Sequence, residues 1–344
     1  MEMTTLGRTG MQVSRLCLGT MMFGPIGNPD HDDCIKIIHT ALDAGINFID
    51  TADAYNKGET EEILGKALSG GRRERVVLAT KGHFPMGSDA NMKGNSRRWI
   101  RRAVEASLKR LNTDYIDLYQ IHRPDSTCDI DETLGALSDL VREGKILNLG
   151  SSTFPAWQLV EAQWVAERRV RERFVAEQSN YSILVRSIET EVLPACEKYG
   201  IGVLVWSPLA GGWLADKFKR GQAATENWRT RLNPSRFDTQ SEGGERKLDI
   251  IENLKALANQ AGMTLIELAL RFVLEHPAVD SAIIGPRTLA QLQSQLSASG
   301  QRLSADVMDA IDKLVPPGGI VNTADFGYQP PSLLNARLRR RPTS

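Results

Sequence analysis

Four side chains with complementary acid–base chemistry follow three successive apolar runs of the sequence. Asp50 ends the first run and Tyr55 follows it after a short turn, while Lys81 and His122 end the next two runs. Short apolar runs between helical patterns predict buried parallel strands, whose carboxyl ends meet at one face of an α/β fold. The spacing therefore predicts that a carboxylate, a phenol, an ammonium and an imidazole converge at that face.

This combination suits proton donation to a carbonyl group. A phenol with a pKa of about 10 is a weak acid at neutral pH, and we expect the Lys81 ammonium to lower the pKa of Tyr55 by stabilising the phenolate. Asp50 would keep Lys81 charged, because an unpaired buried ammonium tends to lose its proton. His122 would hold the substrate oxygen in register with the phenol.

Each of these side chains also has a purely structural interpretation. Asp50 fits a helix or turn cap, Lys81 a surface lysine, His122 an ordinary polar loop and Tyr55 a packed aromatic residue. Such interpretations explain the residues one at a time. Their joint placement at successive strand ends favours a functional site.

The elements that must position these side chains alternate along the chain. Strand-like runs begin near Leu16, Asn47, Val76, Ile116, Ile146, Phe174, Gly202 and Ser281. Helical patterns fill the gaps at 32–44, 60–69, 95–110, 131–143, 155–167, 187–199 and 289–296, with start signals such as Asp32, Thr60 and Ser96. Eight such units predict an α/β fold, a single (β/α)8 TIM barrel over residues 1–330. A doubly wound open sheet is the alternative.

Three further segments lie outside this alternation. The turn at 6–10 predicts an N-terminal β-hairpin ahead of the barrel. The stretch 207–244 is a long loop after the seventh strand without clear periodicity, and loops of that length in compact domains are usually functional. Residues 331–344 end in an arginine-rich run, interpreted as a basic, flexible C-terminal tail.

The composition is that of an ordinary soluble domain. The 344 residues are 41% hydrophobic and 24% charged, with 42 basic and 42 acidic side chains. This balance indicates no general affinity for nucleic acid or a membrane surface, and no apolar run is long enough to span a bilayer. The four cysteines are widely spaced and fit no zinc or disulfide pattern. With no signal-peptide pattern at the N-terminus, we expect a cytoplasmic protein.

Four segments resemble the motifs of the aldo-keto reductases, in the same order and over nearly the whole chain. They are 48–55, 78–81, 118–125 and 206–209. The resemblance, which extends to bacterial NADPH-dependent members, implies reversible reduction of an aldehyde or ketone to an alcohol. It also implies Tyr55 as general acid, Lys81 and Asp50 as the pair that tunes it, and His122 as the orienting group.

The sequence signal for the binding site of the hydride donor is weaker than the signal for the acid–base residues. No Gly-x-Gly-x-x-Gly motif follows a strand, so a Rossmann-type site is not predicted, and no cluster of metal ligands is visible. The last strand runs through Gly285 into Arg287 and the start of a helix. A glycine, an arginine and a helix N-terminus at a strand end form an anion site, and the late loops of barrels often bind phosphate.

By resemblance, this anion site holds the 2′-phosphate end of NADPH through Gly285, Arg287 and Gln291. The other cofactor residues that the resemblance implies are Gly19, Thr20, Met21, Asp50, Ser152, Gln178, Trp206, Ser207, Leu209 and Lys217. Three positions depart from the family pattern: Thr153 and Gln295 replace the usual asparagines, and Trp206 replaces a common tyrosine. These departures affect single contacts rather than the choice of cofactor.

The resemblance implies a small carbonyl or alcohol compound as the substrate, whose identity the sequence does not give. Aromatic and sulfur side chains at loop tips suit a bulky, partly apolar compound, although loop packing explains them equally well. The candidate substrate-facing residues are Met22, Phe23, Tyr55, His83, Phe84, Trp213, Trp228, Phe326 and Tyr328.

Two other functions are compatible with the same scaffold. One is a regulatory subunit that holds NADPH without turnover, as the resemblance to potassium-channel β subunits suggests. The other is a Schiff-base aldolase, because Lys81 ends a barrel strand close to a tyrosine. NADPH oxidation with an aldehyde panel separates the first from a reductase, and borohydride trapping separates the second.

Overall fold

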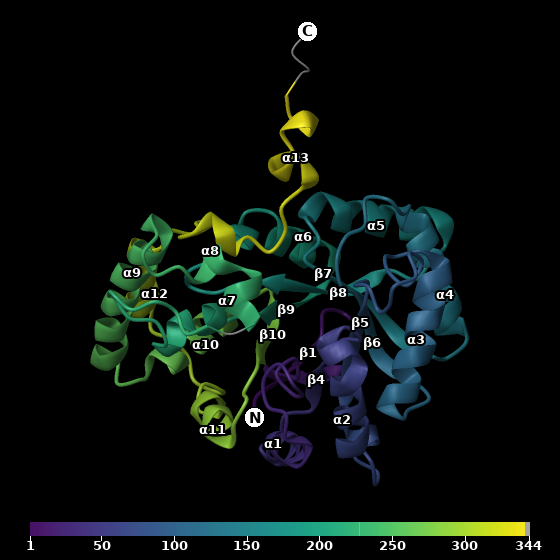
Figure 1. The fold of residues 1–344 in the computed structure, drawn as a ribbon, viewed down its shortest axis with the longest axis horizontal. Helices are drawn as coiled ribbons and strands as arrows, with labels where there is room; N and C mark the ends of the chain where they lie inside the picture. The colour runs from purple at the N-terminus through teal and green to yellow at the C-terminus, as the bar shows by residue number, and fades with distance from the viewer. Residues whose placement is uncertain (227, 341–344) are drawn as a thin grey trace.

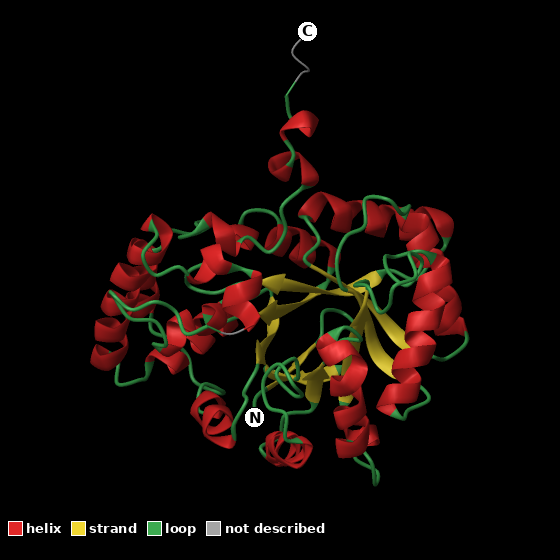
Figure 2. Cartoon of the chain, in the orientation of Figure 1, coloured by secondary structure: helices red, strands yellow, loops and turns green. Residues whose placement is uncertain are grey.

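The computed structural model describes residues 1–226 and 228–340, which form a closed barrel of parallel strands surrounded by helices (Figures 1 and 2). The barrel strands are β3 Leu16–Gly19, β4 Phe48–Asp50, β5 Val77–Gly82, β6 Ile116–Ile121, β7 Ile146–Ser152, β8 Phe174–Asn180, β9 Gly202–Trp206 and β10 Val279–Ile284. They pair in chain order, and β10 closes the ring by pairing with β3, where Ala282 faces Leu16. The predicted (β/α)8 barrel is confirmed, and the open-sheet alternative is wrong because this sheet closes on itself.

Helices cover the outside of the barrel. Those that match predicted patterns are α1 His31–Asp43, α2 Glu59–Ala67, α3 Arg97–Leu111, α4 Ile130–Arg142, α5 Ala156–Arg169, α6 Val192–Tyr199 and α11 Leu289–Leu296. Ser96 caps α3 as predicted, by accepting a hydrogen bond from the Trp99 N–H. Two predicted starts are wrong: Asp30 rather than Asp32 caps α1, and α2 begins after Gly58 without a side-chain cap.

Three helices of 10 residues or more in the described chain were not predicted. They are α9 Glu242–Gln260, α10 Leu265–Glu275 and α12 Ala305–Leu314. The start of α10 carries a capping box, in which Thr264 and Glu267 bind each other's backbone N–H. The spacing of Thr264 and Glu267 was the sequence signal that could have predicted the start of α10. The described residues of the loop between β9 and α9 contain the 3-10 turn η4 Ala210–Ala215 and the short helices α7 Trp228–Leu232 and α8 Pro234–Phe237.

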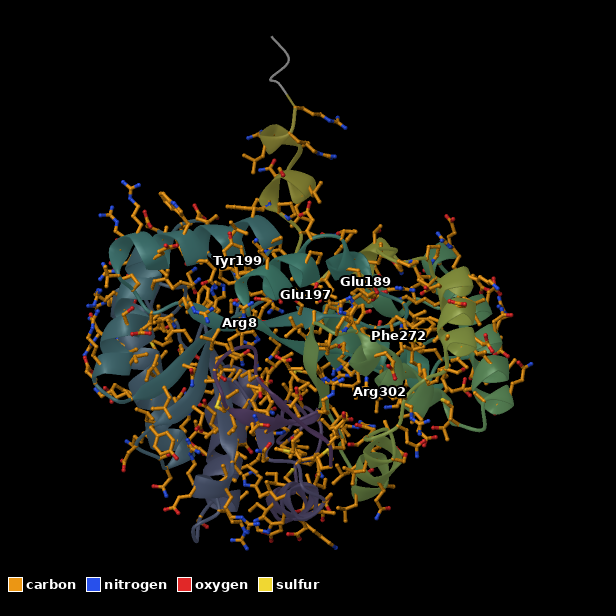
Figure 3. All side chains as sticks on the ribbon, turned by 180° about the vertical axis from the view of Figure 1, so that it is seen from behind. Arg8, Glu189, Glu197, Tyr199, Phe272 and Arg302 are labelled. Carbon is orange, nitrogen blue, oxygen red and sulfur yellow. The ribbon has the colours of Figure 1, made fainter. Side chains whose placement is uncertain are left out.

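The N-terminal hairpin, formed by β1 Met3–Thr5 and β2 Gln12–Ser14, packs against the inside of the barrel. Leu6 and Val13 join one buried apolar cluster with inward-facing residues of the barrel: Cys17, Phe48, Ala79, Leu118, Ala176 and Leu204. The turn is anchored by the Gly7 N–H, which donates to Asp280 at 2.8 Å, and by Arg8, which packs against Gly200 at the end of α6 (Figure 3). The predicted hairpin is confirmed as a plug.

The C-terminal segment first crosses the barrel and then leaves it. The 3-10 turn η5 Thr323–Asp325 places the buried Asp325 carboxylate against Lys247 and Arg236, at 2.6 and 3.0 Å. Beyond it, α13 Pro331–Leu334 and the turn η6 Ala336–Leu338 project away from the barrel (Figure 1). Residues 341–344 of the predicted tail lie outside the described residues.

Within residues 1–226 and 228–340, no single helix is both long and apolar enough to cross a bilayer. The segments Pro234–Gln260 and Leu265–Glu275, which meet at an angle of 91°, reach that length and hydropathy only when taken together.

Candidate active site

A layer of polar side chains lies directly above the apolar cluster that the N-terminal hairpin forms with the barrel. Residues two positions beyond the inward-facing Phe48, Ala79 and Leu118 are Asp50, Lys81 and Gln120. Because alternate residues of a strand face the same side, these three also point into the barrel. Likewise, Gln178 lies two residues beyond Ala176, and Trp206 lies two residues beyond Leu204. The fold thus brings the side chains at the strand ends to one place.

Lys81 lies at the centre of this polar layer and is fully buried. Its Nζ donates to Asp50 Oδ1 at 2.6 Å, to the Thr51 carbonyl at 2.7 Å and to the Tyr55 hydroxyl at 3.2 Å. Removal from water alone would lower the pKa of Lys81, but Asp50 and Tyr55 together raise it above its ordinary value. A charged lysine with all three donors engaged is a poor nucleophile, which argues against a Schiff-base aldolase.

The Asp50 carboxylate is held by two amides as well as by Lys81. Gln120 Nε2 donates to Oδ2 at 3.0 Å and Gln178 Nε2 donates to the same oxygen at 2.8 Å. The carboxylate is 2% exposed, so it depends on these donors for its stability in the interior. Gln120 was not predicted, although its position near the end of β6, two residues before His122, was a usable signal.

Tyr55 begins a short turn that aims its hydroxyl back at Lys81. The turn η1 Tyr55–Gly58 contains Asn56 and Lys57 in the left-handed region, with φ of 48° and 56°. Asparagine tolerates this conformation, and Asn56 secures it by donating to the Phe23 carbonyl at 2.8 Å. The turn therefore fixes the direction in which the Tyr55 ring leaves the backbone.

The pKa of Tyr55 shifts in the opposite direction to the sequence expectation. Removal from water raises the pKa above its ordinary value, and the Lys81 ammonium offsets only part of that rise. Lys81 does lower the pKa of Tyr55 as expected, but this effect does not outweigh the effect of burial, so the net shift is upward. A phenol that stays protonated at neutral pH can still donate its proton, and Lys81 then stabilises the phenolate as it forms.

His122 faces the Tyr55 ring edge to face, with the ring centroids 5.9 Å apart. Burial, together with the positive charges of Lys81 and Arg123, holds the pKa of His122 well below its usual range. The imidazole is therefore neutral at physiological pH. A neutral imidazole can donate one hydrogen bond to a substrate oxygen without adding charge.

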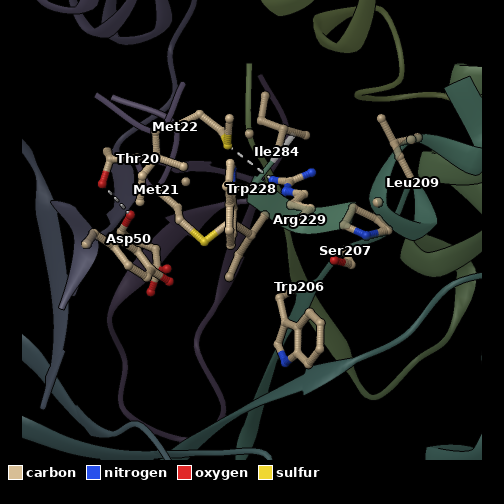
Figure 4. A pocket seen from close by; sticks show the side chains of 18 of the residues that line it. Thr20, Met21, Met22, Asp50, Trp206, Ser207, Leu209, Trp228, Arg229 and Ile284 are labelled. Atoms are coloured by element: carbon tan, nitrogen blue, oxygen red, sulfur yellow. Dashed lines mark hydrogen bonds between the residues drawn. The ribbon is translucent and has the colours of Figure 1, made fainter. Parts of the chain in front are cut away.

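A cavity of about 680 Å³ opens above this layer (Figure 4). Among its lining residues are these predicted site residues: Gly19, Thr20, Met21, Asp50, Tyr55, His122, Ser152, Gln178, Trp206, Ser207, Leu209, Lys217, Gly285 and Gln291. Lys81 lies beneath them, and the exposed Arg287 lies beside the cavity, where its backbone N–H donates to Gln291 Oε1. Figure 4 shows Trp228 standing between Met21 and Met22 on one side and Trp206 on the other.

The candidate substrate-facing residues divide into two groups. Met22, Tyr55, Phe84 and Trp228 line the cavity. Phe23 and Trp213 pack in the core, so their placement at a substrate site is wrong. Trp213 instead stacks on Phe218, with centroids 4.3 Å apart. His83 bonds to Asn95, and neither Phe326 nor Tyr328 is part of the lining.

Cationic side chains gather at the other end of the cavity. Desolvation lowers the pKa of Lys217, and the positive charges of Arg287 and Arg229 lower it further. Two buried polar atoms of the lining, Trp206 Nε1 and Gln295 Oε1, have no hydrogen-bond partner among the described residues. Clustered cations and unsatisfied polar atoms beside an aromatic face fit a phosphorylated, nitrogen-rich aromatic ligand such as a nicotinamide dinucleotide. In the same described ranges, no group of three or more His, Cys, Asp or Glu could hold a metal ion.

The buried Asp53, next to this layer, gives a pH-dependent contribution to stability. Burial raises its pKa to about 7, and the neighbouring Glu61 adds to the rise. The folded protein therefore binds a proton that the unfolded chain has released, so this group's contribution to stability falls as the pH rises from about 4 to 7. Relative to the parent, Asp53→Asn should gain about 1–2 kcal/mol more free energy of unfolding at pH 8 than at pH 5.5. Urea unfolding at both pH values tests this, with the exposed Asp114→Asn as control; a gain independent of pH would contradict it.

A closed barrel with ionisable groups at its carboxyl face is the architecture of barrel enzymes, and comparison with known proteins gives the class: an oxidoreductase that acts on carbonyl or alcohol groups. The model of the Aldo/keto reductase family matches residues 15–316. The chain belongs to this family, whose members generally use NAD(P)H and act on small carbonyl compounds.

Similar proteins are found in bacteria and in plants. "Uncharacterized oxidoreductase YrpG" of Bacillus subtilis is 43% identical over 93% of this chain and 98% of its own length. "Aldo-keto reductase YhdN" of the same organism is 34% identical over 92% of this chain and 94% of its own. "Probable voltage-gated potassium channel subunit beta" of Arabidopsis thaliana is 35% identical over 92% of this chain and 97% of its own.

Proposed function

We propose that this protein is an NADPH-dependent reductase of aldehydes or ketones, in which Tyr55 donates the proton that completes the alcohol. The observation that carries the proposal is the 3.2 Å contact between Lys81 Nζ and the Tyr55 hydroxyl, with Asp50 2.6 Å from the same ammonium. Phenol, ammonium and carboxylate in one buried chain can hand a proton to a developing alkoxide.

In this mechanism each residue of the polar layer has its own task. When bound, the dinucleotide would supply the hydride that the reduction requires. His122, neutral at physiological pH, orients the carbonyl oxygen by hydrogen bonding, and the Tyr55 hydroxyl protonates that oxygen. Lys81 stabilises the phenolate that remains, while Asp50 holds Lys81 in place. In the oxidative direction the phenolate takes the proton back.

The dinucleotide would lie along the cavity from the polar layer to the cationic end. Trp206 offers an aromatic face and Gln178 an amide at the reacting end, and Lys217 lies near the phosphates at the other end. Ser207 has a φ of 57°, unusual for a residue other than glycine, and such strain is concentrated at ligand sites. These features support the cofactor assignment.

The preference for NADPH over NADH depends on Arg287 in this proposal. Its guanidinium would pair with the 2′-phosphate, which NADH lacks. Arg287→Ala should weaken NADPH binding roughly tenfold to 150-fold, from the loss of about 1.5–3 kcal/mol, while NADH binding changes little. Quenching of tryptophan fluorescence measures both affinities, with Trp206→Phe as the test that the signal arises at Trp206. If the affinities for both nucleotides fell equally, Arg287 would not be the residue that recognises the 2′-phosphate.

Steady-state turnover tests the function itself. Purified protein should oxidise NADPH in the presence of aldehydes such as benzaldehyde and 4-nitrobenzaldehyde, and should reduce NADP⁺ slowly with the matching alcohols. If tight NADPH binding occurs without turnover on any aldehyde or ketone of a broad panel, the reductase proposal fails.

The second candidate is a regulatory subunit that holds NADPH, supported by the similarity to the Arabidopsis protein described as a potassium-channel β subunit. The cofactor cavity suits both functions equally. The complete acid–base layer favours the reductase, because a binding protein has no need of a phenol held against a buried ammonium. Binding without turnover is the result that would favour the second candidate.

A further inference from the structure

Arg123 follows His122 and lines the cavity beside the acid–base layer. It is half-buried, and its guanidinium lies over the rings of Phe84 and Trp206, 5.6 and 6.0 Å from their centroids. Among the described residues its guanidinium donates one hydrogen bond, from Nη1 to the His122 carbonyl at 2.6 Å. Most of its donors are therefore available to a ligand in the cavity.

Arg123 differs in this respect from other arginines that are withdrawn from solvent. Four of those arginines pair with a carboxylate: Arg73 with Asp117, Arg110 with Glu61, Arg186 with Glu189 and Arg236 with Asp325. Arg15, also partly buried, instead donates to two backbone carbonyls, those of Val279 and Leu274. Within the described part of the chain, no carboxylate lies within 4.0 Å of Arg123. Glu177 acts on it electrostatically but is already bonded to Ser151 and Ser179. A guanidinium taken partly out of water without a counter-ion is costly, and an anionic ligand would remove that cost.

The position of Arg123 also separates it from the cations assigned to the cofactor. The charges that act on Lys217 are those of Arg287 and Arg229, whereas the groups that act on Arg123 are Tyr55 and Glu177. Arg123 thus belongs to the reacting end of the cavity, next to the phenol. An anion bound there lies beside the carbonyl group rather than along the dinucleotide phosphates.

We propose that Arg123 is a specificity-determining residue that binds a carboxylate carried by the carbonyl substrate, so that the preferred substrates are oxo-acids or carboxylated aldehydes. The guanidinium fork binds a carboxylate through two parallel hydrogen bonds, and Phe84 stacks on the apolar body of the same substrate. The proposal rests on the proposed reductase function for the identity of the reacting group. The anion site itself can be tested without turnover.

Binding of an unreactive pair of ligands tests the anion site. Benzoate and benzamide have nearly the same shape, and only benzoate is charged. Calorimetric titration of the unsubstituted protein, loaded with NADP⁺, should show tighter binding of benzoate. Arg123→Met, which keeps the length of the apolar stem, should reduce the ratio of the two affinities roughly tenfold to 100-fold, and Arg123→Lys should lose less.

Matched variants locate the bound anion. The exposed Arg102→Met is the surface control, and Lys217→Met tests the cationic end of the cavity. The proposal is overturned if benzoate and benzamide bind equally to the unsubstituted protein, or if benzoate binding depends on Lys217 and not on Arg123. The comparison within the unsubstituted protein remains decisive even if Arg123→Met does not fold.

Turnover then extends the test to the substrate class. With benzaldehyde and its 2-, 3- and 4-carboxy derivatives, at least one carboxylated isomer should have the higher kcat/KM, and Arg123→Met should abolish that advantage mainly through KM. If Arg123 only assisted Tyr55, the variant would lower kcat equally for charged and neutral aldehydes and would shift the pH profile. If no aldehyde turns over although benzoate still binds through Arg123, the reductase function fails while the anion site stands.

Discussion

Replacing Tyr55 by phenylalanine should lower kcat for carbonyl reduction by about 10²–10⁴-fold, the usual contribution of a positioned general acid. The change removes only the hydroxyl that lies 3.2 Å from Lys81 Nζ and leaves the aromatic ring in its turn. NADPH affinity should stay close to that of the parent, because the cationic end of the cavity is untouched. Stopped-flow hydride transfer and fluorescence titration measure the two quantities separately.

Tyr199→Phe on the outer helix α6 is the matched control, since it removes a hydroxyl from a residue that is 38% exposed. It should leave turnover near the parent rate. The Tyr55→Phe rate should also lose the pH dependence that the phenol imposes on the parent. Full activity of Tyr55→Phe would refute the role of Tyr55 and leave His122 as the group to examine.

Periodic patterns were sufficient to predict the barrel. All eight strand-like runs became barrel strands, because buried parallel strands are apolar on both faces and stand out between helical patterns. The helices α9 and α12 were not predicted. They lie where the strand–helix alternation is interrupted by a long insertion and a C-terminal extension, so neither had an expected place in the repeat.

The candidate site was predictable where it depends on local sequence and less so where it depends on distant contacts. Asp50, Lys81 and His122 lie at or next to the ends of three strands, and barrel geometry brings strand ends together. The pairing of Asp325 with Lys247 joins the 3-10 turn η5 to the helix α9, which are far apart in the sequence, and no local pattern predicts it. The pKa of Tyr55 was also not predictable, because its sign depends on how much water the folded chain excludes.

Replacing Lys81 by methionine should have the largest combined effect, on stability as well as on activity. Methionine fills similar space but leaves the Asp50 carboxylate, 2% exposed, without its ion-pair partner. Breaking one side of a buried pair costs about 3–5 kcal/mol of unfolding free energy, although Gln120 and Gln178 still donate to the carboxylate. Urea unfolding measures this loss. Turnover should fall at the same time, because the Tyr55 phenolate then loses the ammonium that stabilises it most.

The double variant Lys81→Met with Asp50→Asn separates the two consequences. A neutral amide at position 50 removes the unpaired buried charge, so much of the lost stability should return, while turnover should stay low because the ammonium is still absent. Recovery of both stability and turnover would show that Lys81 serves folding alone and would exclude it from proton transfer. Recovery of stability without turnover is the result that a buried ammonium beside a donating phenol requires, since only the charge of Lys81, and not the packing of its stem, can stabilise the phenolate.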